Sequence, residues 1–142
     1  WLDSGVLDGP IGTSVVTDTD ANYLYNHEVG YDADGSAMTA YIESGDLEIG
    51  DGERFTMLNR VLPDFNFSGD TGEASIAMTI KGSNFPLETS STLATATITS
   101  TTTQANIRAR ARHTILRVES DGLGFGWRLG GFRFGMRQDG RR

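Results

Sequence analysis

The stretch EASIAMTIK, Glu73–Lys81, alternates apolar side chains with small or polar ones along its whole length. Ile76, Met78 and Ile80 share one parity. Successive side chains of a β-strand point to opposite faces of a sheet, so a period of two indicates a strand with one buried face. Helical periodicity is nearly absent from the rest of the chain. We therefore expect an all-β protein.

The same alternation continues on both sides of this stretch. Further strands are predicted at 54–62, 93–103, 107–118 and 124–137, and the threonines of 93–103 fall on one strand face. Clusters of Gly and Asp separate these segments, and both residue types tolerate the left-handed backbone of tight turns. Strands at this spacing without helices between them predict an antiparallel β-sandwich or a β-propeller-blade-like module with short hairpins.

Three positions are expected to interrupt the strands. Pro63 cannot donate a hydrogen bond to a sheet and should end the strand 54–62. Side-chain parity changes near His113, where a bulge would account for it. Parity changes again at Gly130-Gly131, where a bend costs little. Both changes are expected of strands that turn a corner between two sheets.

Length and composition fit a single all-β module over residues 1–142. Within it we expect a hairpin-rich acidic part at 1–52 and the main antiparallel sheets at 53–142. The 142 residues contain no Cys, which excludes a disulfide framework, a thiolate metal site and a Cys nucleophile. No apolar run approaches the ~18 residues of a membrane span, so no membrane partner is expected.

Charge is strongly segregated along the chain. Residues 105–142 hold nine arginines against three acids, a net +6, whereas residues 1–104 carry a net −13. Such a chain can dock on a copy of itself, basic segment against acidic segment. The candidate contacts to a neighbouring subunit or to DNA are Arg108, Arg110, Arg112, Arg117, Arg141 and Arg142. The candidate acidic partners are Asp32, Asp34, Asp46, Asp51 and Glu53.

No residue pattern indicates catalysis or a cofactor. His27 and His113 are the only histidines, and no GxSxG motif marks a nucleophile. The Asp-rich segments at 18–22 and 32–35 do not match a calcium-binding loop. We therefore expect no enzyme, no metal site and no cofactor.

Two stretches carry a resemblance to a known family. Residues 105–142 combine an alternating Arg strand, a Gly-rich turn, GWRLG, a Phe/Arg strand and a terminal DGRR. Residues 27–65 run from an acidic turn through a short strand and a GDGE turn to an apolar strand ending in Pro-Asp. This order resembles the C-terminal portion of tail nozzle, or hub, proteins of short-tailed bacteriophages. Those subunits are several times longer, so the resemblance implies a portion of a larger subunit.

The resemblance implies a structural virion protein of the tail, assembled in the bacterial host cytoplasm. It further implies a homo-oligomeric ring that closes the portal channel and retains packaged DNA, with other tail and portal proteins as partners. The alternative is a glycan-binding β-sandwich of a tail fibre or secreted protein, with Tyr23, Tyr25 and Tyr41 as its platform.

Arg108, Arg110 and Arg112 would project about 6.6 Å apart from one face of a strand. They could form a solvated outer face of an edge strand, where charge discourages aggregation. They could instead bind acidic loops of a neighbouring copy, because Arg forks suit carboxylates. Non-specific DNA contact is the third interpretation, although an acidic body repels phosphate unless the segment lines a ring's lumen. We favour the contact between copies.

Overall fold

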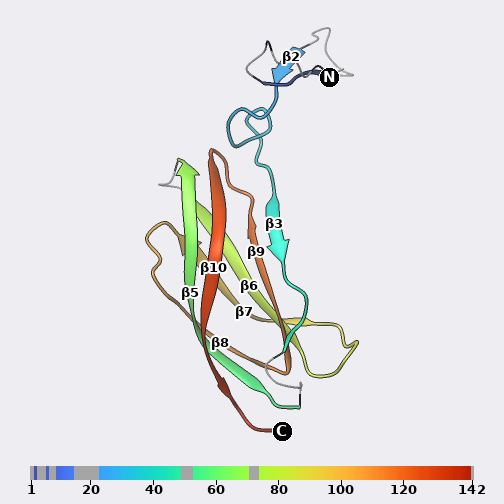
Figure 1. The fold of residues 1–142 in the computed structure, drawn as a ribbon, viewed down its shortest axis with the longest axis vertical. Helices are drawn as coiled ribbons and strands as arrows, with labels where there is room; N and C mark the ends of the chain where they lie inside the picture. The colour runs from blue at the N-terminus through green and yellow to red at the C-terminus, as the bar shows by residue number, and fades with distance from the viewer. Residues whose placement is uncertain are drawn as a thin grey trace. The chain divides into compact units, whose positions relative to one another are not determined.

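The computed structural model describes Leu2, Val6 and residues 9–14, 23–48, 53–70 and 74–141 (Figure 1). Over these residues the fold is all-β, with antiparallel sheets in a sandwich-like arrangement and no helix. The predicted fold class is confirmed. The strands are β1 (Ile11–Ser14), β2 (Tyr23–Asn26), β3 (Ala40–Glu43), β4 (Leu47–Glu48), β5 (Thr56–Gly69), β6 (Ser75–Ser83), β7 (Ser91–Thr99), β8 (Ala105–Ala111), β9 (His113–Ser120) and β10 (Phe125–Gln138).

The chain divides into two compact units, Trp1–Tyr31 and Asp32–Arg142. In the first unit β1 pairs with β2. The second unit contains a three-stranded sheet in the order β10-β5-β8 and a five-stranded sheet in the order β3-β9-β6-β7, with β4 also on β9. The division thus falls after Tyr31 rather than after residue 52, because β3 and β4 pair with β9 of the main sheet.

The core of the second unit lies between its two sheets. Ile76 and Met78 of β6 are completely buried and Ile80 is nearly so, which confirms the parity of the EASIAMTIK stretch. Aromatic side chains of β5 and β10 pack against this core from the other sheet; they are Phe65, Phe67, Trp127, Phe132 and Phe134. Trp127 Nε1 donates a hydrogen bond of 2.8 Å to Ser120 Oγ and so joins the two sheets.

The two predicted changes of parity coincide with changes of direction or register. β8 ends at Ala111 in one sheet and β9 begins at His113 in the other, so Arg112 is the corner between the sheets. On β10 the register with β5 shifts between Leu129 and Phe132, on either side of the double glycine. Both predictions of an interruption are confirmed.

The prediction that Pro63 ends its strand is wrong, because β5 continues through it to Gly69. β8 pairs with β5 only as far as Val61, so beyond that point β5 has an open edge on the side of β8. On its other side Pro63 lies opposite Phe132, where the ladder with β10 is already irregular. Proline is tolerated in strands at such edges and bulges.

Candidate interaction surface

The register of the three-stranded sheet decides which side chains face outward. Val61 lies opposite Phe134 of β10 and Ala105 of β8, and its side chain is completely buried between the sheets. Its neighbour Arg60 therefore points to the outer face. The same alternation places six arginines on this outer face, which we call the arginine face: Arg60, Arg108, Arg110, Arg128, Arg133 and Arg137.

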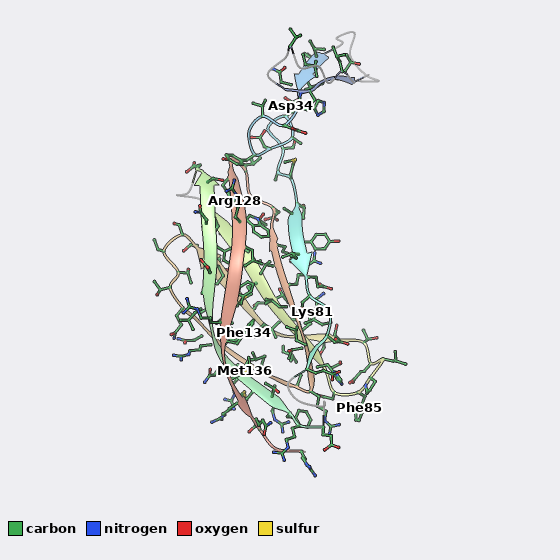
Figure 2. All side chains as sticks on the ribbon, in the orientation of Figure 1. Asp34, Lys81, Phe85, Arg128, Phe134 and Met136 are labelled. Carbon is green, nitrogen blue, oxygen red and sulfur yellow. The ribbon has the colours of Figure 1, made fainter. Side chains whose placement is uncertain are left out.

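Five of these six arginines are exposed and unpaired. Within the described ranges, no salt bridge involves the five that β5, β8 and β10 hold outward, which are Arg60, Arg108, Arg128, Arg133 and Arg137. Arg110 differs, since its Nε lies 2.6 Å from Asp139 Oδ2. Its guanidinium also lies 3.8 Å from the centre of the Phe55 ring. Figure 2 labels Arg128 on β10.

Arginines from the two outer strands converge across β5. Arg108 of β8 and Arg137 of β10 line one open hollow of ≈360 Å³, together with Met57 and Asn59 of β5. Arginine donates hydrogen bonds in a planar fork that suits phosphate and carboxylate groups. A hollow flanked by two such groups is therefore suited to an anion.

Glycines on β10 leave room for the long side chains of β5. A Cβ on Gly135 would come within 2.5 Å of Arg60 Cγ and 2.9 Å of its Nε. At Gly130 a Cβ would come within 2.5 Å of Asp64 Oδ2. Both positions lie over the arginine face, so side chains from β5 can extend across β10 instead of being blocked by it.

The structure uses most of the predicted basic residues within the chain. Only Arg108 stands exposed without an acidic partner in the described structure. Arg112 Nη2 donates a hydrogen bond of 3.2 Å to the carbonyl oxygen of Arg141, while its buried Nε has no partner among the described atoms. Arg117 lies on the other sheet, and Arg142 falls outside the described residues. The predicted stripe is thus split between a face, a corner and a second sheet.

The predicted acidic partners are also partly occupied. Glu53 lies 3.4 Å from Arg141, an ion pair within one copy between two residues predicted to pair between copies. Asp32 Oδ1 accepts a hydrogen bond of 3.2 Å from the Gly35 amide. Asp34 and Asp46 are exposed, and Asp51 falls outside the described residues. No contact between copies is present to test the prediction, which remains one.

Sequence reasoning missed Arg60, Arg128, Arg133 and Arg137. The signal for the last two was present, because Phe132, Arg133 and Phe134 alternate as a half-buried strand should. Arg60 could not be assigned to the same face from sequence, because that needs the pairing of β5 with β8 and β10.

A four-residue ion network occupies the outer face of the five-stranded sheet. Glu43 Oε2 lies 2.7 Å from Lys81 Nζ and 3.3 Å from Arg117 Nη1, and Arg117 Nη2 lies 2.7 Å from Glu119. The hydrogen bond from Lys81 is the main cause that lowers the pKa of Glu43, and the hydrogen bond to Glu119 is the main cause that raises the pKa of Arg117. This sheet therefore neutralises its own charges, unlike the arginine face.

We expect the stabilising effect of Glu43 to disappear in acid. Its pKa lies below the ordinary value of 4.5 in the folded protein, so its contribution is present above 4.5 and is lost as the pH falls through the folded pKa. The midpoint of thermal unfolding should differ between wild type and Glu43→Gln at about pH 6 and converge at about pH 3. A difference that grew on acidification would contradict this assignment.

The remaining chemistry of the described residues is sparse. No group of three or more His, Asp or Glu in the described ranges could hold a metal ion. His113 Nδ1 lies 2.7 Å from Glu48 Oε1, which holds β4 to β9. No described helix is long and apolar enough to cross a membrane.

The three tyrosines of the glycan-binding alternative do not share a unit. Tyr23 and Tyr25 lie in the first unit, with ring centres 6.1 Å apart and ring planes tilted by 53°. Tyr41 lies in the second unit, where the Arg117 guanidinium is 4.1 Å from its ring centre. Neither described unit by itself holds the predicted platform.

Comparison with known proteins leaves the interpretation to the geometry. No protein-family model matches the sequence, and no curated protein shows significant similarity to it.

Proposed function

We propose that this chain is a structural module of a bacteriophage tail, from the C-terminal part of a nozzle-like subunit. In this proposal it belongs to a homo-oligomeric ring that closes the portal channel and retains packaged DNA. The arginine face is the observation that carries the proposal, and its role is contact with the DNA backbone. The tail, the ring and the portal come from the resemblance of residues 27–65 and 105–142.

The arginine face calls for a polyanionic partner. Its five unpaired arginines belong to a protein with a formal net charge of −7, so nearby acids could have neutralised them. Like charges held on one face repel one another, and a partner rich in phosphates offsets that cost. Duplex DNA offers such a partner, with about one negative charge per 1.7 Å of its axis.

The composition of this face favours the DNA backbone over unpaired bases. The aromatic side chains of β5 and β10 pack toward the core, and the outward positions of β5, β8 and β10 carry none in the described structure. Binding of single strands relies on aromatic side chains that stack on bases. A face of arginines and asparagines suits phosphate contacts, which position a duplex without reading its sequence.

The size of the face also fits a duplex. β10 has 14 residues, which corresponds to about 45 Å at the rise of a strand. One helical turn of DNA is about 34 Å. Arg128 and Arg137 lie toward opposite ends of β10, so the face can follow the backbone for about one turn.

The double variant Arg60→Gln with Arg108→Gln should raise the dissociation constant for duplex DNA by about tenfold or more. Both residues are exposed on strands other than β10. Fluorescence anisotropy with a labelled duplex of about 30 base pairs at low salt measures the change. The matched control is Lys81→Gln with Arg117→Gln, which removes the same charge from the other sheet and should change affinity much less. Equal losses in both variants would leave only net charge and overturn the proposal.

A further inference from the structure

The two long sides of the sandwich in the second unit differ. On one side β7 contacts β8, and the chain passes from β8 to β9 through the corner at Arg112. The opposite side is bounded by the end strands of the two sheets, which are β10 on one and β3 with β4 on the other. We call this the open side.

Apolar side chains at the open side remain half exposed. Ile42 lies opposite the buried Val118 and so faces the interior, yet it is 51% exposed. Leu47 of β4 and Met136 of β10 are each 45% exposed. Both line an apolar cleft of ≈240 Å³ between the sheets, into which Phe134 also faces (Phe134 and Met136 are labelled in Figure 2). These side chains have the orientation of core residues without the cover of a core.

The strands at the open side also have unpaired edges. In the described structure β10 pairs only with β5, while β3 and β4 pair only with β9. Their outer backbone amide and carbonyl groups therefore offer hydrogen bonds to another strand. β10 is long, and β3 and β4 follow one another along the same edge of β9.

The two edges carry opposite charge. β10 contains three arginines and no acid. The segment Asp32–Glu48, which includes β3 and β4, contains five acids and neither Lys nor Arg. Glu43 and Glu48 also bind cationic side chains behind them, whereas Asp34 and Asp46 have no ion-pair partner among the described residues. An edge of each sign on the same side makes the surface complementary to itself.

We infer that the open side is the docking surface for a second copy of this chain, with β10 of one copy beside β3 and β4 of the other. Docking covers Ile42, Leu47 and Met136, extends a sheet across the contact and brings the arginines of β10 near the acidic segment. A foreign extended peptide would use one edge only, whereas a second copy uses both edges and the cleft between them. The inference rests on the homo-oligomeric part of the proposed function.

Ile42→Lys should raise the dissociation constant of self-association by about tenfold or more, because it removes apolar burial and adds a cation near the arginines of β10. Leu123→Lys is the matched control, since Leu123 is also 51% exposed but lies in the β9–β10 connection. Sedimentation equilibrium of the full chain at low salt measures both. Asp46→Arg is a second variant that should weaken association without touching the apolar side chains.

The outcomes separate this inference from the proposed function. Association that weakens in Ile42→Lys and Asp46→Arg but not in Leu123→Lys supports it, whether the species is a dimer or a larger ring. A wild type that stays monomeric, or variants that associate as tightly as wild type, would overturn it. Duplex binding by a single copy uses Arg60 and Arg108, so Ile42→Lys should retain it. Retained DNA binding without association would refute the docking surface alone.

Discussion

Replacing Met78 with Ala should lower the free energy of unfolding by about 2–5 kcal/mol. Met78 is completely buried in β6, opposite Ala96 of β7 and Val118 of β9. Because β6 is paired on both sides, its backbone cannot move to fill the space that the side chain leaves. The cost of the remaining cavity therefore adds to the lost apolar burial. Urea unfolding followed by circular dichroism should show a lower midpoint with an unchanged slope.

Met136→Ala provides the control for that experiment. It makes the same chemical change on β10 at a side chain that is 45% exposed. Solvent or small movements can fill the space there, so the cost should stay below about 1 kcal/mol. A Met136→Ala variant as unstable as Met78→Ala would mean that the open side is already covered, and would count against the exposure on which the docking surface depends.

Local pattern was sufficient to predict the strands and their interruptions. The alternation around Met78 predicted the strand and its buried face, because one buried sheet face imposes a period of two. The change of parity at His113 and the pair Gly130-Gly131 predicted a corner and a bulge, because such changes need an irregular backbone. These features depend on neighbours in sequence, which the sequence displays directly.

Features that depend on pairing between distant strands could not be predicted in the same way. Pro63 was expected to end a strand, and it does not because β8 is shorter than β5 and leaves that edge open. The pairing of β3 and β4 with β9 joins segments about 70 residues apart. Nothing in the local sequence of Ala40–Glu48 distinguishes this pairing from a separate hairpin.

The candidate site shows the same limit. Charge counting identified the basic segment, but it grouped Arg108 with Arg112 and Arg117, which the corner at Arg112 directs elsewhere. The register of β5 instead brings Arg60 onto the face that Arg108 occupies. Sequence gives the number of charges, whereas register decides which of them share a surface.

Affinity for duplex DNA should fall by up to about 500-fold when the salt concentration rises from about 50 to about 200 mM. Each phosphate contact releases counterions, and the logarithm of the binding constant falls by about 0.9 per contact for each tenfold rise in salt. The five unpaired arginines set an upper limit of five contacts. A smaller slope would count how many of them reach phosphate at once.

The slope should also respond to the loss of individual arginines. With Arg60→Gln and Arg108→Gln, at most three contacts remain, and the same rise in salt should lower affinity by up to about 40-fold. Lys81→Gln with Arg117→Gln should keep the wild-type slope, because those residues lie on the other sheet. Anisotropy titrations at four or more salt concentrations give each slope directly. If both double variants kept the wild-type slope, phosphate would not lie on the arginine face, and the DNA-retaining role would lose its contact surface.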